Sequence, residues 1–236
     1  MTDKKLIALV LIILPLLQGC ADTYNITPVE HQNVYLPADK AEILINRPKL
    51  PAQNKVQAII NFAGKVTSKK TNDLTSYIHK QMQEGIKDFI LNINSSGGDS
   101  DAAIAAYQYL KQLPISITTY NTGNVQSAAA LLYCSGAKRY SLSHSFFMLH
   151  GSSTTYPESM SFVDFTALSK LSQIHRQAFV EIFKTCTNAS TAVLEHYFSS
   201  ADLHYFTADE AKEMGLAQEI AAPEFARTAN FFNITD

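Results

Sequence analysis

The sequence predicts an α/β fold with a mostly parallel sheet. Short apolar strands alternate with amphipathic helices from Val56 onward, a pattern typical of parallel sheets with helical crossovers. The chain has 236 residues, 46% of them hydrophobic and 17% charged, which suits one globular domain with appended segments. Glycine, serine and histidine follow several of the strands, and α/β proteins place their functional sites at that edge of the sheet.

The amino-terminal segment predicts export. Lys4 and Lys5 precede an apolar stretch over residues 6–17, which is too short to span a bilayer comfortably and is typical of a secretory signal. The following residues, Leu17-Gln18-Gly19-Cys20, resemble a bacterial lipobox, in which the signal is cut before the cysteine and the cysteine is acylated. We therefore predict a signal peptide over residues 1–19 and lipidation of Cys20. An ordinary signal peptide with an incidental cysteine is the alternative.

Acylation of Cys20 would hold the protein on a membrane without a spanning helix. Ala21, rather than aspartate, follows the cysteine, and resemblance to envelope lipoproteins then favours the outer membrane. We expect a lipid-anchored protein of the bacterial cell envelope that faces the periplasm. Residues 20–54 are rich in proline and show little periodicity, so they predict a linker with one short strand near Ala41 to Ile45.

A domain over residues 55–222 follows the linker. Its strands are predicted at residues 56–62, 88–94, 115–120 and 139–149, and its first helices at 72–85, 100–113 and 127–136. Asp99 or Ser100 caps the second helix, and Pro114 ends it.

The last third of the chain is predicted to be helical. Apolar residues form one long stripe over residues 162–185, and a helix with such a stripe usually packs on something extended. A shorter helix is expected at 191–198. Thr207 and Glu210 stand at capping-box positions and predict a helix over 207–216. Residues 223–236 are expected to form a tail.

Ser127 begins a predicted helix directly after the turn at residues 123–126. A serine at that place lies beside unpaired backbone N–H groups and the positive end of the helix dipole, which favour negative charge on a nearby oxygen. His150 follows a strand and could take the serine proton, which would make Ser127 a nucleophile. On its own, such a serine is more often a helix cap, and such a histidine can be a structural hydrogen-bonder.

Gly97 and Gly98 end another predicted strand. Glycine lets a backbone approach a bound carbonyl closely and adopts positive φ, as a backbone donor aimed into a cleft often requires. A plain turn is the alternative.

Four motifs in order resemble the signature of the Clp-type serine peptidases over roughly Val56 to Ile220. They are Ile93–Gly98, Gly123–Ala128, Met148–His150, and Phe206–Ala211 with Gly215-Leu216. The resemblance implies the ClpP/crotonase spiral of β-β-α units, with residues 162–185 as a long handle helix. Together with the lipobox-like residues, it suggests a lipoprotein-anchored variant of this family. It further implies Ser127 as nucleophile, His150 as general base, and an oxyanion hole formed by the N–H groups of Gly98 and Ala128.

The acid of the implied triad is displaced in this sequence. The family pattern has an aspartate shortly before the segment matched by Tyr205–Ala208, and alignment without a gap puts Leu203 there. A one-residue bulge would bring Asp202 into place, and we predict Asp202 as the third member. Because this acid orients the histidine, a misplaced acid would leave a slow enzyme.

Cys134 and Cys186 remain after the signal is removed, each in an apolar helical pattern. Buried free thiols are expected, and a disulfide is the alternative in an oxidising envelope. Four other histidines lack the spacing of a metal site, so we predict solvated surface or helix-face positions for them, and no metal or other cofactor. These histidines are His144, His175, His196 and His204.

These features together predict a serine endopeptidase that acts outside the cytoplasm on peptides or unfolded polypeptides. ATP is absent there, so we expect ATP-independent action without an ATPase partner, and the family resemblance suggests a homo-oligomer. A net charge of −2 without a basic run argues against nucleic acid. The alternatives are an inactive scaffold or binding protein, a crotonase-like acyl-CoA enzyme, and a peptidase with a Ser-Lys dyad.

Overall fold

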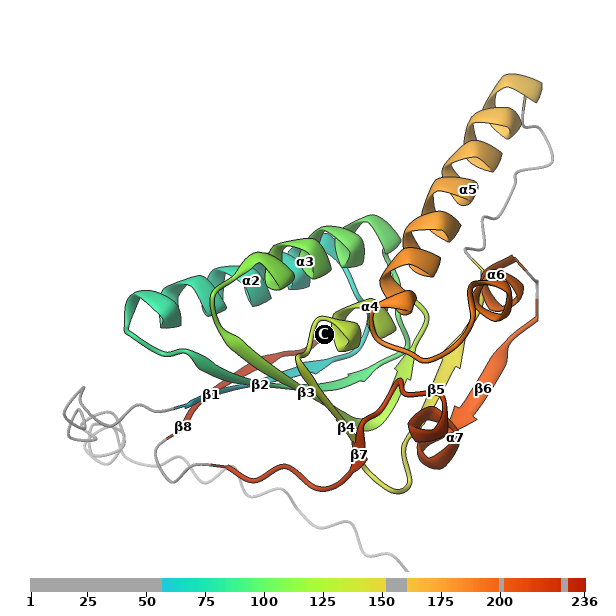
Figure 1. Cartoon of the computed structure of the whole chain (residues 1–236). Coiled ribbons are helices and arrows are strands. Elements are labelled where there is room, and N and C mark those ends of the chain that lie inside the picture. The colour runs from blue at the N-terminus through green and yellow to red at the C-terminus, as the bar shows by residue number, and fades with distance from the viewer. Residues whose placement is uncertain (1–56, 152–160, 200–201, 226–228) are drawn as a thin grey trace, which may run out of the picture. The chain divides into compact units, whose positions relative to one another are not determined.

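The computed structural model describes residues 57–151, 161–199, 202–225 and 229–236. The predicted signal peptide, Cys20 and the linker with its expected strand lie outside these residues. Within them, strands and helices alternate and build one sheet (Figure 1). No helix in the described part of the chain is both long and apolar enough to cross a membrane.

The sheet orders its strands as β6-β5-β3-β2-β1-β8, with β4 beside β3 and β7 beside β4. All pairs are parallel except β5 with β6. Because parallel neighbours run in one direction, the ends of β2, β3 and β5 meet at one edge. The strands are β1 (Gln57–Ala63), β2 (Asp88–Ser95), β3 (Ser116–Gln126), β4 (Lys138–Ser141), β5 (Phe146–Leu149), β6 (His204–Thr207), β7 (Glu219–Ile220) and β8 (Ala229–Ile234).

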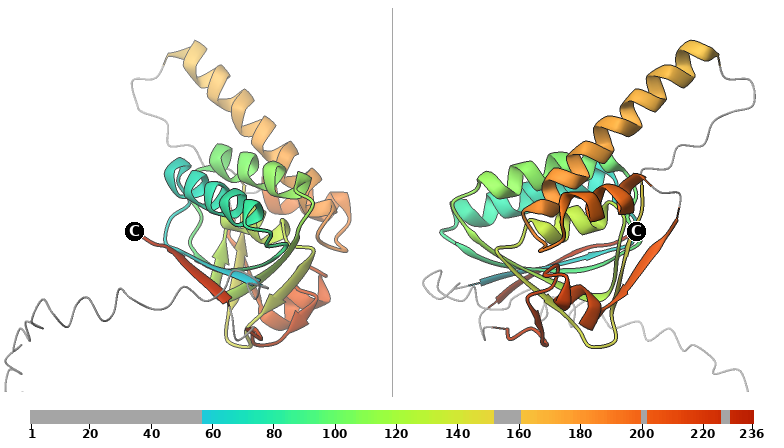
Figure 2. Two further views of the ribbon diagram at one scale, coloured as in Figure 1. Left: turned by 90° about the vertical axis from the view of Figure 1, so that its left-hand side faces the viewer. Right: turned by 45° about the vertical axis from the view of Figure 1, so that its right-hand side comes forward.

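Helices α2, α3 and α4 cover one face of the sheet, and α2 lies beside α3 (Figures 1 and 2). Thr67 caps α2 and Asp99 caps α3, because each side chain accepts a hydrogen bond from the first turn of its helix. The predicted capping box of Thr207 and Glu210 is confirmed at α7. The helices are α2 (Ser68–Gln83), α3 (Ser100–Gln112), α4 (Ala129–Cys134), α5 (Phe162–Lys184), α6 (Thr191–Ser199) and α7 (Ala208–Glu213).

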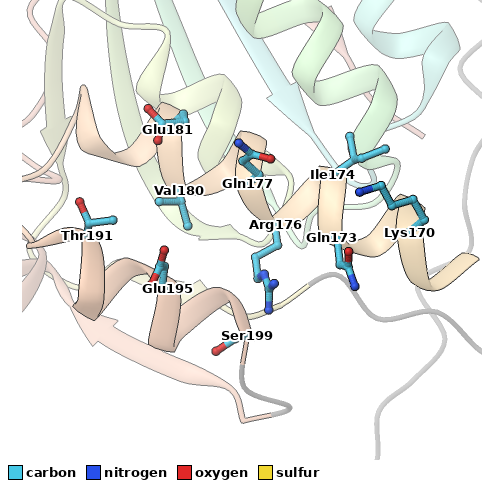
Figure 3. Close-up of a pocket in the computed structure, with 10 residues that line it drawn as sticks. All are labelled: Lys170, Gln173, Ile174, Arg176, Gln177, Val180, Glu181, Thr191, Glu195 and Ser199. Atoms are coloured by element: carbon cyan, nitrogen blue, oxygen red, sulfur yellow. The ribbon is translucent and has the colours of Figure 1, made fainter.

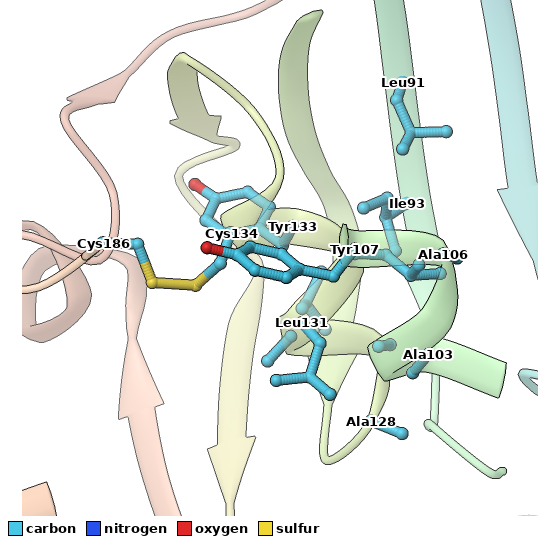
Figure 4. Close-up of a cluster of buried hydrophobic side chains, with 14 of the residues drawn as sticks. Leu91, Ile93, Ala103, Ala106, Tyr107, Ala128, Leu131, Tyr133, Cys134 and Cys186 are labelled. Carbon is cyan, nitrogen blue, oxygen red and sulfur yellow. A yellow bond between two sulfur atoms is a disulfide. The ribbon is translucent and has the colours of Figure 1, made fainter. Parts of the chain in front are cut away.

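The main core lies between this sheet face and helices α2 to α4. Figure 4 shows part of it, where Ile93 of β2 lies near Ala106 of α3 and Leu131 of α4. Every residue of α4 is buried. Packing on all sides therefore fixes the helix that follows Ser127.

A disulfide joins Cys134 at the end of α4 to Cys186 just after α5 (Figure 4). The Cα atoms are 5.6 Å apart, and the two residues are only 1% and 2% exposed. The prediction of free thiols was wrong because helical patterns alone do not show that α4 packs against the end of α5.

Helix α5 projects beyond the sheet (Figures 1 and 2). One face of its C-terminal half is buried through residues such as Phe179 and Phe183, whereas Phe162 is 82% and Ile174 52% exposed. The described residues therefore cover the predicted apolar stripe over only part of its length. His175, predicted at a surface or helix-face position, lies on α5 and is buried, and its Nε2 contacts Asp101 Oδ1 at 2.8 Å.

Three other predicted elements differ from the structure. Residues 229–234, expected in a tail, form β8, because Ile234 is buried and Phe232 stacks on Tyr77 of α2. The strand expected at 139–149 is divided into β4 and β5. Strand β3 continues to Gln126 and so delivers Ser127 directly.

Candidate active site

Ser127 occupies a sharp turn between β3 and α4. Its φ is +51°, and among the described residues it is the only non-glycine residue with positive φ. Its N–H donates to the Met148 carbonyl at 2.7 Å, which continues the pairing of β3 with β5. A left-handed residue between a strand and a helix is strained, and such strain is typical of nucleophile turns that expose a side-chain oxygen.

His150 lies beside Ser127 because β5 and β3 are parallel neighbours. Its Nε2 is 2.8 Å from Ser127 Oγ, which is hydrogen-bond distance between a nucleophile and its base. The imidazole is half-buried. Burial lowers the pKa of His150 below its ordinary value of 6.5, opposed by a hydrogen bond with the Gly151 backbone. The neutral form, which can accept a proton, is therefore favoured near neutral pH.

Gly97 and Gly98 lie against the Ser127 turn. A Cβ on Gly97, whose φ is +84°, would come within 2.7 Å of the Gln126 carbonyl and 2.8 Å of Ser127 Cβ. Gly98 has a φ of +150°, and a Cβ there would overlap the Val66 carbonyl. Both positions therefore require glycine, for conformation and for space.

Val66 fixes the orientation of Gly98. The Val66 N–H donates to the Gly97 carbonyl at 2.8 Å, and the Asp99 N–H donates to the Val66 carbonyl at 3.0 Å. In such a parallel bridge the N–H of the central residue, Gly98, points away from its partner strand. Sequence reasoning missed Val66, since a bridge of one residue leaves no periodic pattern.

The Ala128 amide directly follows Ser127, and the Gly98 amide follows Gly97, the residue that lies against Ser127. Within the described residues, neither amide donates to a protein acceptor. Two unpaired backbone donors beside a nucleophile can stabilise the oxyanion of a tetrahedral intermediate. The sequence resemblance implied these two amides as the oxyanion hole, and that role stays a prediction.

Asp202 lies where β6 approaches the end of β5. Leu149 pairs with His204 in the antiparallel register of these strands. Continuing that register sets Leu203 opposite His150 and Asp202 opposite Gly151. Asp202 is exposed at this position, and its role as the acid stays a prediction.

The described residues hold no cluster of three or more histidine, cysteine, aspartate or glutamate side chains that could bind a metal ion. His144 and His196 are exposed as predicted, and His204 is partly buried. A separate surface cavity of about 480 Å³ lies between α5 and α6 (Figure 3). Its lining includes Lys170, Arg176 and Glu195 but neither Ser127 nor His150.

The fold and these groups define an α/β protein of the ClpP type, in which a serine and a histidine meet beside two backbone donors. A family model described as Clp protease matches residues 39–224. The chain belongs to the Clp protease family.

Known relatives agree with this assignment. The ATP-dependent Clp protease proteolytic subunit 4 of Rhodococcus jostii is 31% identical over 159 residues, covering 63% of this chain and 76% of that protein. The corresponding subunit 1 of Chlamydia pneumoniae is 26% identical over 162 residues, covering 67% of this chain and 84% of that protein. A solved ClpP1 variant from Listeria monocytogenes matches with a TM-score of 0.61 and 19% identity, covering 70% of this chain and 91% of that one. The last similarity supports the fold alone.

Proposed function

We propose that this protein is a serine endopeptidase that cleaves peptides or unfolded polypeptides through an acyl-enzyme. The observation that carries the proposal is the 2.8 Å contact between Ser127 Oγ and His150 Nε2. The family, the two glycines and the amides of Gly98 and Ala128 support it.

In the proposed reaction, Ser127 Oγ attacks the carbonyl carbon of the scissile bond while its proton passes to His150 Nε2. The oxyanion accepts hydrogen bonds from the Gly98 and Ala128 amides. His150 then gives the proton to the leaving amine, and the carbon–nitrogen bond breaks. A water molecule hydrolyses the resulting ester, with His150 as base, and Ser127 recovers its proton. Asp202 is proposed to orient the imidazole and stabilise its charged form.

We propose that the protein acts at the membrane of the bacterial cell envelope, anchored by acyl chains on Cys20. The lipobox-like residues support the anchor, and the Cys134–Cys186 disulfide supports an oxidising compartment. Metabolic labelling with a palmitate analogue tests the anchor. Wild type should be labelled and Cys20→Ala should not; an unlabelled wild type would refute it.

ATP is absent from such a compartment, so we propose ATP-independent cleavage, although the relatives are named as subunits of ATP-dependent proteases. Substrates would then be short or already unfolded. The exposed apolar residues on the first half of α5 support self-association. Size measurement of the delipidated domain should give an oligomer, and a strict monomer would contradict this part of the proposal.

A catalytically inactive scaffold is the main rival, motivated by the displaced acid. A crotonase-like acyl-CoA enzyme is the other rival, but the proposed location lacks coenzyme A. Labelling with a fluorophosphonate and hydrolysis of peptide and acyl-CoA substrates separate these functions. We expect wild type to be labelled and to hydrolyse peptides only. Ser127→Ala should do neither, and His150→Ala should show little labelling and little hydrolysis. Absence of labelling in wild type would favour the scaffold.

A further inference from the structure

Strand β8 lies beyond the residues that the Clp protease family model matches, which end at 224. It pairs in parallel with β1 over Gln57 to Phe62. The side chain of Phe232 stacks on Tyr77 of α2 with ring centres 4.2 Å apart, and Ile234 is buried. These contacts hold β8 against β1 and α2, and the chain continues from the end of β8 to Asp236.

Asp236 reaches the loop between β1 and α2. Its Oδ1 accepts a hydrogen bond from Lys70 Nζ at 2.5 Å, and the same ammonium donates to the Ala63 carbonyl at 2.8 Å. The Lys65 backbone also donates to this carboxylate, and with Lys70 it holds the pKa of Asp236 below its ordinary value. The absence of a side chain at Gly64 leaves room for the Asp236 carboxylate, because a Cβ there would overlap it.

The residue after Lys65 is Val66, which holds Gly97 and Asp99 through its two backbone hydrogen bonds. A second link joins the same segments, because Ser68 Oγ donates to Asp99 Oδ2 at 3.1 Å. The Asp236 carboxylate is thus connected to the Gly98 donor through one short loop. Lys70 is only 6% exposed. A buried ammonium group needs a partner of opposite charge, and the Asp236 carboxylate provides it.

We propose that Asp236 is a positioning residue for the oxyanion hole. Its carboxylate holds the loop at residues 63–66, and that loop holds the Gly98 amide at the position where the oxyanion forms. Asp236 touches no reacting atom. The catalytic consequence rests on the proposed peptidase function, whereas the structural link does not depend on it.

The test compares Asp236→Asn and Asp236→Ala with the control Asn230→Ala in the full-length chain. Asn230 lies at the other end of β8, where its side chain donates to Gln81 Oε1 at 2.6 Å. The control thus removes one hydrogen bond between β8 and α2 but leaves the loop at 63–66 intact. Asp236→Glu keeps the charge and should restore part of any loss.

Hydrogen exchange of peptides covering residues 64–67 and 96–100 is the readout that needs no activity. We expect both segments to exchange faster in Asp236→Asn than in the control. In the peptidase assay, kcat should fall about tenfold with KM little changed, a smaller loss than removal of an oxyanion donor causes. Exchange equal to that of Asn230→Ala, or faster exchange with unchanged kcat, would overturn the proposal. A wild type that fails to react refutes the peptidase function, and the exchange comparison still decides whether Asp236 holds the loop.

Discussion

Replacement of Gly98 by alanine is the perturbation that most sharply separates backbone strain from catalysis. At φ +150°, residue 98 occupies a region open essentially to glycine, and its Cβ would overlap the Val66 carbonyl. The Gly98→Ala chain can relieve the overlap by turning the peptide unit or by separating residue 98 from Val66. Either movement displaces the amide that faces the site.

The expected size of the effect has two parts. A non-glycine residue in such a region costs about 1–3 kcal/mol of folding stability. Loss of one oxyanion donor lowers turnover by roughly 10²–10³, equivalent to about 2.7–4 kcal/mol of transition-state stabilisation. We therefore expect Gly98→Ala to fold with reduced stability and to be acylated at least a hundredfold more slowly, within that range.

Gly85→Ala is the matched control. Gly85 also has a positive φ, +88°, but a Cβ there meets nothing within 4 Å. The Gly85→Ala protein should lose about 1–2 kcal/mol of folding stability because of the backbone conformation alone, and its acylation rate should stay at the wild-type value. Thermal unfolding and the rate of fluorophosphonate acylation measure the two quantities. A folded Gly98→Ala protein that is acylated at the wild-type rate would refute the assignment of this amide to the oxyanion hole.

The further predictions concern the base His150, the Cys134–Cys186 disulfide and the proposed acid Asp202. Because burial lowers the pKa of His150, acylation should rise with pH with a midpoint below 6.5; a midpoint above 6.5 would contradict the burial argument. Because the pKa of His150 is lower in the folded state, the folded protein is more stable above pH 6.5 than in acid, and this stability is lost as the pH falls through the folded-state pKa. Denaturant titrations at several pH values should show a weaker acid dependence in His150→Ala. The double variant Cys134→Ser/Cys186→Ser removes the disulfide, which joins residues 52 positions apart in the sequence, and its free energy of unfolding should fall by about 2–4 kcal/mol. An unchanged denaturation midpoint would show that the disulfide does not stabilise the fold. Asp202→Asn should lower kcat with little change in KM if Asp202 orients the imidazole, and an unchanged kcat would assign the acid role to another residue or to none.

The sequence predicted most helices because their signals are local, whereas the site pair depends on how the strands are paired. Caps at Asp99 and Thr207 and apolar periodicity place the helices, and a serine after a glycine turn and a histidine after a strand lie at edges that parallel pairing brings together. The 2.8 Å contact between Ser127 and His150 follows from the register of β3 with β5. The prediction of this pair therefore depended on topology more than on either residue alone.

The features that were missed depend on contacts between segments distant in sequence. The Cys134–Cys186 disulfide requires α4 to pack on the end of α5, and β8 requires a free edge of β1. Val66 acts through a bridge of one residue. None of these arrangements produces a periodic pattern within its own segment.

The central claim is that the Ser127 hydroxyl is a nucleophile activated by His150. Mass spectrometry of the fluorophosphonate-treated protein, followed by peptide mapping, tests it most directly. We expect a single adduct on Ser127 in wild type, none in Ser127→Ala, and little in His150→Ala. An adduct on another residue, or one that persists without Ser127, would contradict the account.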